Sequence, residues 1–422
     1  MYSLPRGTQD ILPPDQPYWR YVQEVAEGLC RHYGYQRIDT PVFEETALFV
    51  RTVGEGTDIV DKEMYTFQDK GGANLTLRPE GTAPVCRAYI QHGMHNLPQP
   101  VKLYYFAPIF RYDRPQAGRF RQHHQVGFEA IGEADPALDA EVIDLAWRLY
   151  VDLGLRGMSL ELNSIGCPAC RPAYLESLVA YYRPLAALLC RDCQARLERN
   201  PLRLLDCKKE GCQPYAGEAL KSSEHLCADC REHFESLQRR LARLGIPFHL
   251  NHRLVRGLDY YTRTVFEVQP QEEGAQSTIG GGGRYDSLIE QLGGKSTPAV
   301  GFATGIERII LNMKRQGIDL PAQAEATVFV SYAGDVAREQ ALDLVARLRR
   351  EGIPATSAFD RKSLKAQLRQ ADARGVRFAL ILGEDELRDG AVTLREMEGG
   401  RQERIEAARI PEELRWRVFG KS

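Results

Sequence analysis

Eight of the ten cysteines lie between Cys167 and Cys230, and this clustering constrains how the middle of the chain can fold more than any other feature. They form the four pairs CPAC, CRDC, CKKEGC and CADC, three with two intervening residues and one with four. Both spacings are typical of zinc ligands, and eight thiolates suit two tetrahedral sites. Structural zinc is therefore predicted over free thiols, with an iron–sulfur cluster as a lesser alternative.

Combining pairs that are neighbours in the sequence predicts one assignment of the ligands, although the sequence does not exclude an interleaved one. The first site would contain the first four cysteines of the cluster: Cys167, Cys170, Cys190 and Cys193. The second site would contain the remaining four: Cys207, Cys212, Cys227 and Cys230.

The length, net charge and hydrophobic pattern of the chain limit the classes of protein to which it can belong. Its 422 residues are too many for one ordinary core and predict two or three domains. A net charge of −2 excludes a uniformly basic polyanion binder but allows local basic patches. No segment has the pattern of a signal peptide or a membrane span, so a cytoplasmic location and no membrane partner are expected. Because that compartment keeps thiols reduced, metal is favoured over disulfides for the cysteines.

Changes of pattern along the chain predict its domains. Residues 1–166 mix helical and strand-like segments, and strand-rich sequence resumes over residues 246–321. The cysteine-rich residues 167–245 therefore have the character of an insertion between two parts of one core. Residues 326–422 alternate strand and helix patterns, which predicts a small autonomous α/β domain.

Arginines gather in RYDRPQAGRFR at residues 111–121, a loop-like stretch with strand-like sequence on both sides. Such a hairpin suits phosphate, because guanidinium pairs bidentately with phosphate oxygens; a solvated charged turn is the competing interpretation. Arg308 follows two glycines that allow a ligand close to the backbone, although alone it is more simply a helix-surface arginine. The run GGGGRYD at 280–286 predicts a tight turn beneath a flat ligand.

Three carboxylates lie in apolar, strand-like surroundings: Glu80 in LTLRPEGTAP, Glu129 in GFEAIG and Asp259 in RGLDYY. An unpaired carboxylate is costly in such a place, so each is expected to meet an arginine, a metal or a cationic substrate group. A buried structural ion pair is the alternative for each residue taken singly.

Several of these stretches together resemble a known family. FRYDRPQAGRFRQHHQVGFE resembles motif 2 of class II aminoacyl-tRNA synthetases, AVGFATGIERI resembles motif 3, and TPVFEET resembles motif 1. Within that class, LVRGLDYYTRTVFEV and GGGGRYDSLIEQLGG are similar to the two signatures of the histidyl-tRNA synthetase family, and LTLRPEGTAP also resembles that family. The match runs from RGTQDILP near the start into the C-terminal domain.

The resemblance implies an α+β fold, in which an antiparallel six-stranded sheet flanked by helices precedes a mixed α/β anticodon-binding domain. Motif 1 would form the interface of a homodimer. The implied reaction has two steps: histidine and ATP, with Mg²⁺ on the phosphates, form histidyl-adenylate, and histidine then passes to the 3′ end of its tRNA. The alternatives are a regulatory-subunit paralogue of ATP phosphoribosyltransferase, a class II ligase for another amino acid, and a zinc-ribbon RNA-binding protein.

The resemblance also implies roles for individual residues. Arg111 and Arg256 would be the catalytic pair on the α-phosphate, and Arg119 and Arg308 would complete the ATP site. The histidine site would contain these residues: Glu80, Thr82, Gln125, Glu129, Arg256, Tyr261 and Tyr285. The tRNA would meet the 111–121 loop and the basic run at 361–377 through these residues: Arg114, Gln116, Arg121, Arg361, Lys362, Lys365 and Arg369. For the basic run, a solvated helix face is the alternative.

Overall fold

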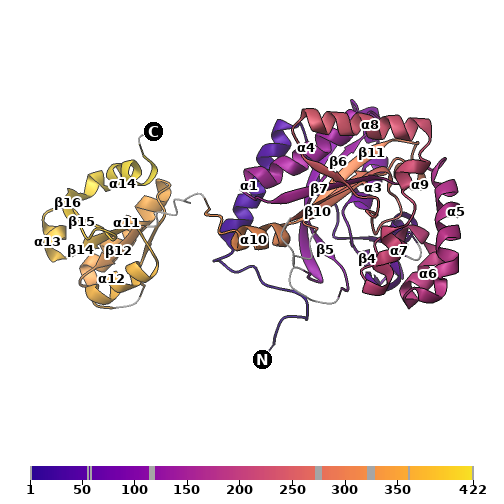
Figure 1. Cartoon of the computed structure of the whole chain (residues 1–422). Helices are drawn as coiled ribbons and strands as arrows, with labels where there is room; N and C mark the ends of the chain where they lie inside the picture. Colours follow the sequence, from indigo (N-terminus) through magenta and orange to yellow (C-terminus); the bar gives the residue numbers. More distant parts are fainter. Residues whose placement is uncertain are drawn as a thin grey trace. The chain divides into compact units, whose positions relative to one another are not determined.

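The chain forms two compact units, Met1–Leu320 and Pro321–Ser422, in a computed structural model (Figure 1). The structure describes residues 2–54, 57, 59–113, 119–270, 278–320, 328–359 and 362–420. None of the helices in these ranges is both long enough and apolar enough to span a membrane.

The larger unit is built on an eight-stranded sheet with the order β1-β5-β6-β11-β10-β9-β7-β8. The six inner strands pair antiparallel throughout: β5 (Val101–Phe110), β6 (Gln122–Ile131), β11 (Ala299–Gly305), β10 (Gly280–Arg284), β9 (Thr262–Pro270) and β7 (Met158–Ser164). The six-stranded antiparallel sheet is therefore confirmed. Two short parallel strands, which were not predicted, extend its edges: β1 (Gln36–Arg37) and β8 (Phe248–Leu250).

The glycine run at 280–283 is strand β10 in the middle of this sheet, so the predicted tight turn is wrong. Its neighbours on both sides come too close for side chains. A Cβ at Gly282 would overlap the carbonyl oxygen of Gly301, and one at Gly280 would lie 2.6 Å from the ring of Phe302. Glycine therefore serves here to let backbone and aromatic rings approach a central strand.

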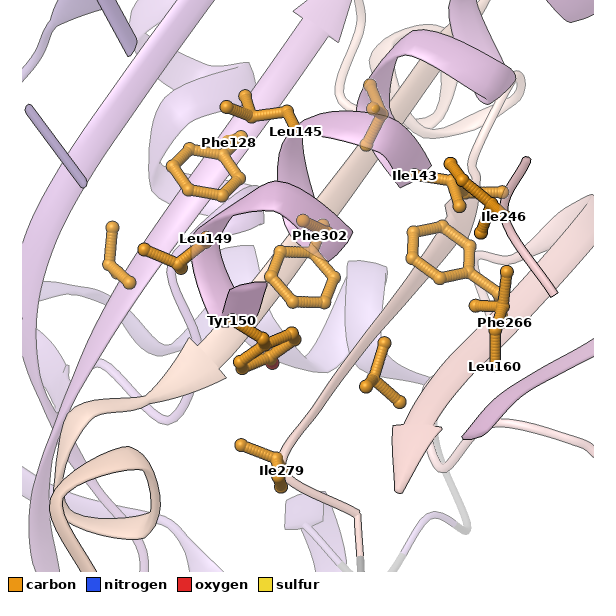
Figure 2. Close-up of a cluster of buried hydrophobic side chains, with 14 of the residues drawn as sticks. Phe128, Ile143, Leu145, Leu149, Tyr150, Leu160, Ile246, Phe266, Ile279 and Phe302 are labelled. Atoms are coloured by element: carbon orange, nitrogen blue, oxygen red, sulfur yellow. The ribbon is translucent and has the colours of Figure 1, made fainter. Parts of the chain in front are cut away.

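A row of aromatic rings crosses the sheet at this strand, as Figure 2 shows. Phe302 stacks on Phe128 with ring centroids 5.9 Å apart and on Phe266 at 5.8 Å, although β10 lies between the strands that carry Phe302 and Phe266. Leu149 and Tyr150 of α4 (Pro136–Asp152) cover the row. Gly282 leaves the gap that the two rings fill.

Helices α1 (Gln16–His32) and α8 (Ala228–Arg243) pack against α4, and α10 (Ile306–Arg315) packs against β6 and β11. The start of α4 is capped, since the carboxylate of Asp135 accepts from the amide of Ala137 at 2.7 Å. These elements share one apolar core, which holds that layer of helices to the sheet.

A second core joins the sheet to the cysteine-rich insertion and to the helices near it. The helices around it are α3 (Thr82–Gln91), α9 (Leu288–Gln291), α5 (Arg171–Tyr182), α6 (Arg191–Arg199) and α7 (Gln213–Gly217). A small sheet ordered β2-β4-β3 lies nearby in sequence, with α2 (Thr46–Val53) and a π-helical turn, Ile59–Glu63. Its strands are β2 (Phe43–Glu45), β3 (Tyr65–Gln68) and β4 (Asn74–Leu77). Short 3-10 turns of this unit are Met94–Asn96, Arg183–Leu188, Pro201–Leu204, Glu210–Cys212 and Ser222–His225.

The smaller unit is a mixed α/β domain, as predicted. Its sheet has the order β13-β12-β14-β15-β16, parallel across the first three strands and antiparallel across the last three. The strands are β12 (Val328–Tyr332), β13 (Ala355–Ser357), β14 (Phe378–Leu382), β15 (Ala391–Glu396) and β16 (Gln402–Glu406). Its helices are α11 (Asp335–Arg350), α12 (Leu364–Ala373), α13 (Glu384–Arg388) and α14 (Ile410–Phe419), with a 3-10 turn at Ala407–Arg409.

Candidate active site

A cavity of about 490 Å³ opens in the larger unit against strands β10 and β11. Its walls come from the ends of β6 and β9, the start of α10, the segment after β5 and one segment of the insertion. The four arginines predicted for the ATP site all line it: Arg111, Arg119, Arg256 and Arg308. Arg111 and Arg308 are almost 200 residues apart in the sequence, and the pairing of the strands in the antiparallel sheet brings them to the same cavity.

The positive charges around the cavity perturb one another. Burial lowers the pKa of Arg308, and the charges of Arg119 and Arg111 lower it further. Arg111 is fixed by donating from Nε to the carbonyl oxygen of Pro79 at 2.7 Å, and Arg119 pairs with Asp113 at 3.2 Å. Guanidinium groups held this close to one another suit an anion with several oxygens.

Arg256 lies on the cavity wall shortly before the core strand β9. Its Nη1 pairs with Glu267 of β9, and its guanidinium lies 5.7 Å from the ring centroid of Tyr261. Burial acts to lower its pKa, but Glu267 and Tyr261 outweigh burial and the pKa is raised, so the charge persists. Nothing in the described residues accepts from its buried Nε, and a Cβ at Gly281 would lie against Nη1. The residue is therefore a fixed cation with a donor left for a ligand.

Beside the cavity lies a fully buried cluster centred on Glu129 of β6. Its Oε1 accepts from Thr82 at 2.7 Å and from Tyr105 at 3.3 Å, and its Oε2 accepts from Tyr285 at 2.5 Å. Burial raises the pKa of Glu129 to about 8, although these donors oppose the shift. Glu129 is paired with Gly301 across the sheet, where a Cβ would overlap Oε2.

Glu80 caps the start of α3 next to this cluster. Its two oxygens accept from the amides of Thr82 at 2.6 Å and Ala83 at 2.8 Å. Burial raises its pKa, and the two amide donors oppose the shift. Tyr260 reaches Glu80 at 3.5 Å and its ring lies 4.7 Å from that of Tyr261. The tyrosines thus connect Glu80 to the edge of the arginine-lined cavity.

The structure separates the predicted histidine-site residues into two groups. Gln125 and Arg256 line the cavity, whereas the others lie in the buried cluster: Glu80, Thr82, Glu129, Tyr261 and Tyr285. Asp259 belongs to neither, since it accepts from Asn200 of the insertion at 2.8 Å. Its carboxylate also lies where a side chain at Gly54 would be.

Two further contributors were not found from the sequence. Tyr105 donates to Glu129, and its ring fills the space left by Gly81 and Gly127, where a Cβ would overlap it. The sequence signal that could have revealed Tyr105 was the pair of glycines, Gly81 and Gly127, in otherwise apolar stretches. His123 of β6 lines the cavity, and burial with the charges of Arg111 and Arg308 lowers its pKa to about 3, so it is neutral.

The predicted tRNA-binding residues lie in both units. Arg121 places its guanidinium 3.8 Å from the ring centroid of Tyr112, whereas Arg114 and Gln116 fall outside the described residues. In the smaller unit Lys362, Lys365 and Arg369 are exposed at and along α12, and Arg361 falls outside the described residues.

The eight clustered cysteines form two groups of four, and the neighbour pairing predicted from the sequence is wrong. The outer site contains the first and last pairs: Cys167, Cys170, Cys227 and Cys230. The inner site contains the two pairs between them: Cys190, Cys193, Cys207 and Cys212. Helix α5 separates the first two pairs, and its twelve residues span about 18 Å. The helix separates Cys170 from Cys190, and the folded insertion places the start of α8, with Cys227 and Cys230, beside the first pair instead.

The sulfur geometry fits tetrahedral metal. In the outer site Cys167 Sγ lies 3.8 Å from Cys170 Sγ and 3.9 Å from Cys227 Sγ, and in the inner site Cys190 and Cys207 are 4.0 Å apart. A zinc ion with four thiolates at its usual bond length separates the sulfurs by roughly 3.8 Å. A disulfide needs about 2.05 Å, so these are not disulfides.

The comparisons with known proteins agree over both units. Residues 7–170 and 184–309 match the family described as histidyl-tRNA synthetase, and residues 327–417 match one described as anticodon binding domain. A histidine–tRNA ligase of Dehalococcoides mccartyi (strain ATCC BAA-2266 / KCTC 15142 / 195) is 62% identical over 405 residues, 96% of this chain and 97% of the relative. The chain belongs to the histidyl-tRNA synthetase family.

Other members of this family are similar over the same length. A histidine–tRNA ligase of Pelotomaculum thermopropionicum is 49% identical, over 99% of both chains. The crystal structure of apo histidyl-tRNA synthetase from S. aureus matches with a TM-score of 0.83 at 40% identity, over 98% of this chain and 99% of that one. The resemblance seen in the sequence motifs is thereby confirmed.

A structure described as an ATP phosphoribosyltransferase regulatory subunit/histidyl-tRNA synthetase from Bacillus halodurans C matches less closely. Its TM-score is 0.64 at 21% identity, over 91% of this chain and 98% of that one, which shows a shared fold alone.

Proposed function

We propose that the chain is a histidine–tRNA ligase. It forms histidyl-adenylate from histidine and ATP and then transfers histidine to the 3′ end of its tRNA. One observation carries the proposal: an arginine-lined cavity and a buried carboxylate–tyrosine cluster meet at Arg256 and Tyr261, whose guanidinium and ring are 5.7 Å apart. A charged phosphate chain and a small polar side chain would therefore be held side by side.

In the first step the carboxylate of histidine attacks the α-phosphorus and pyrophosphate leaves. Arg111 and Arg256 bind the α-phosphate oxygens, where charge builds up in the transition state, and Arg308 and Arg119 bind the outer phosphates. Mg²⁺ bound to the phosphates would spread the charge of the leaving pyrophosphate. The protein provides position and charge in this step rather than a covalent intermediate.

The buried cluster selects the amino acid. Imidazole has two ring nitrogens, so one can bond to Glu129 and the other to the hydroxyl of Tyr261. Thr82, Tyr105 and Tyr285 hold the carboxylate of Glu129 in place through their hydroxyls. A side chain without ring nitrogens would leave buried polar groups unpaired, which is how such pockets reject analogues strongly.

The remaining histidine-site residues bind the backbone groups of the amino acid. Glu80 provides negative charge for the ammonium group, with Thr82 beside it and Gln125 on the cavity wall. Because the raised pKa of Glu80 comes from burial, a cation placed next to it favours the ionised form.

The tRNA binds through two surfaces. Its acceptor end approaches the 111–121 loop, including Arg121, and its anticodon meets the smaller unit. Lys362, Lys365 and Arg369 give that unit exposed positive charge on one helix and the residues before it.

The enzyme acts as a homodimer through the motif 1 region. Val42 and Phe43 are 39% and 48% exposed there, and Phe43 forms an edge-on pair with Phe67, which is 43% exposed. Contiguous exposed apolar side chains of this kind mark an interaction surface.

Each four-cysteine site binds a structural zinc ion. The outer site lies at the end of β7, where Arg171, directly after Cys170, donates to the carbonyl oxygen of Tyr261 at 2.6 Å. Burial acts to raise the pKa of Cys167, but hydrogen bonds from nearby backbone amides and neighbouring thiols lower it to about 7, which favours the thiolate that metals require. Elemental analysis of protein purified without added metal tests this: two zinc ions per chain support it, and iron would indicate clusters instead.

ATP–pyrophosphate exchange with each amino acid in turn tests the proposed function. Exchange with histidine alone supports it. Exchange with another amino acid would indicate a different class II ligase, and no exchange with any would contradict the enzyme assignment. The regulatory-subunit and zinc-ribbon alternatives are not favoured, because the chain retains the arginine set and the second domain.

A further inference from the structure

Two cations on the cavity wall come from the cysteine-rich insertion, and no motif of the family resemblance includes them. Arg203 and Lys208 line the same cavity as Arg111, Arg256 and Arg308. Both lie in the segment between helices α6 and α7, and Lys208 directly follows Cys207, a ligand of the inner site.

We infer that Arg203 and Lys208 bind phosphate oxygens in the cavity, and that metal at the inner cysteine site holds them there. The inference deepens the proposed function and rests on it for the identity of the ligand. The chemistry needed is that of a phosphate ester or anhydride. The phosphate group could belong to ATP and its pyrophosphate, or to the phosphodiesters that join the last nucleotides at the 3′ end of the tRNA.

The charge of the cavity wall supports an anionic ligand. Among the described residues that line it, six carry positive charge and four carry negative charge, with His123 neutral. The carboxylates bind protein groups as well; Glu267 pairs with Arg256, Asp113 with Arg119, and Glu307 with His124. The cations outnumber the carboxylates, and their mutual repulsion costs free energy unless a ligand supplies negative charge.

The segment that carries the two cations has little regular structure. Between the end of α6 at Arg199 and the start of α7 at Gln213 it contains only the 3-10 turns Pro201–Leu204 and Glu210–Cys212. The inner site joins the last residue of the segment to the start of α6, since the amide of Cys190 donates to Cys212 Sγ at 3.3 Å. Four thiolates on one metal would fix a segment that helix hydrogen bonds do not hold.

Contacts from the segment reach the stretch that carries the catalytic arginine. Asn200 donates to Asp259 at 2.8 Å, and Arg203 binds Asp206 at 3.1 Å, which orients its guanidinium. Arg203 Nη1 lies only 3.2 Å from where a Cβ on Gly257 would be. Glycine next to Arg256 therefore leaves room for a second guanidinium beside the first.

Lys208→Gln tests the phosphate contact, with Lys209→Gln as its matched control. Lys209 is the exposed neighbouring residue and is not among the cavity-lining residues. Losing one charge-assisted hydrogen bond should weaken ligand binding by about tenfold. Calorimetric titration with ATP and with inorganic pyrophosphate is the first measurement, and the aminoacylation KM for tRNA is the second.

The two measurements separate the two ligand sources. Weaker binding of ATP and pyrophosphate assigns Lys208 to the nucleotide, whereas an increase in the KM for tRNA alone assigns it to the 3′ end. If Lys208→Gln matches Lys209→Gln in both, the inference is overturned. Because the titrations need no turnover, they stand even if histidine-dependent exchange fails, in which case the proposed function falls and the phosphate site does not.

Cys212→Ser tests the role of the metal, with Cys227→Ser in the outer site for comparison. Elemental analysis should show one zinc ion per chain in either variant, and circular dichroism checks the fold. Loss of the inner metal should reproduce the weaker binding of Lys208→Gln, and combining the two changes should add little, because both act through one contact. A Cys212→Ser protein that lacks the inner zinc but binds pyrophosphate and tRNA like the wild type would refute the positioning role.

Discussion

The arginine-lined cavity and the buried cluster around Glu129 adjoin each other but are built in opposite ways. The cavity collects like charges, and the pKa of Arg308 is lowered by burial first and then by the charges of Arg119 and Arg111. In the cluster each carboxylate oxygen of Glu129 already accepts a hydrogen bond from a hydroxyl group. The first region thus keeps an excess of positive charge until a ligand arrives, whereas the second is organised in advance. That difference fits a site that neutralises phosphate on one side and selects a side chain on the other.

Replacing Arg256 by alanine should have the largest effect. It removes the fixed cation at the junction of the two regions, and adenylation should slow by roughly 10²–10³-fold, the usual cost of losing a preorganised charge. Histidine binding should persist, because the hydroxyl contacts to Glu129 remain. ATP–pyrophosphate exchange measures the first quantity and equilibrium dialysis of histidine the second.

Arg183→Ala is the control for this change, since Arg183 is 62% exposed on the insertion and pairs only with an exposed Glu198 among the described residues. An Arg256→Ala protein that exchanges pyrophosphate as fast as Arg183→Ala would contradict the catalytic role. If Arg256→Ala also lost histidine binding, the cavity and the buried cluster would not act as separate binding regions.

Glu129→Gln should have the next largest effect, and on the other region. The amide has nearly the shape of the carboxyl group but replaces one acceptor oxygen with an NH₂ donor, so histidine affinity should fall by about 100-fold while ATP affinity stays within about twofold. Glu24→Gln, an exposed position on α1, is the control. Equal losses of ATP and histidine affinity would mean that the cavity and the cluster are not separate sites.

The smallest predicted effect concerns stability and pH. Glu129 is 1% exposed, and burial raises its pKa to about 8 in the folded chain, against about 4.5 for an ordinary glutamate. The protonated form is therefore favoured in the fold. Because the folded chain binds this proton more tightly than the unfolded chain, the proton stabilises the fold. This contribution to the free energy of unfolding is complete below pH 4.5 and is lost progressively as the pH rises to 8.

Between pH 5.5 and 7.5 this loss should be on the order of 2 kcal/mol in the free energy of unfolding. Glu129→Gln removes the titration, so the stability of the variant relative to the wild type should improve by that amount over the same range. Chemical denaturation of ligand-free protein at the two pH values measures it. A difference between variant and wild type that does not change with pH would show that Glu129 is ionised throughout.

The sequence was sufficient to predict those residues of the candidate site that lie within a single motif. Arg111, Arg256 and Arg308 line the cavity and each lies in one of the quoted motifs. Thr82 and Tyr285, which contact Glu129, also lie in such motifs, because each motif spans a strand or helix start and the loop beside it. Tyr105 was missed, since its role depends on the register that sets it opposite Gly127. Lys208 was missed because only the folded insertion brings it to the cavity.

The cysteines divide in the same way between sequence and structure. Spacing alone predicted paired metal ligands and their number, because a short loop fixes how two thiolates can share an ion. The nested assignment depended on α5, which separates Cys190 from Cys170, and on the fold of the insertion, which places Cys227 and Cys230 at the start of α8 beside the first pair. The sequence therefore determined the family, the charged motifs and the cysteine pairs by itself. The tertiary structure decided which pairs combine and which cations share the cavity, because those contacts join residues that only rigid helices and sheet register bring together.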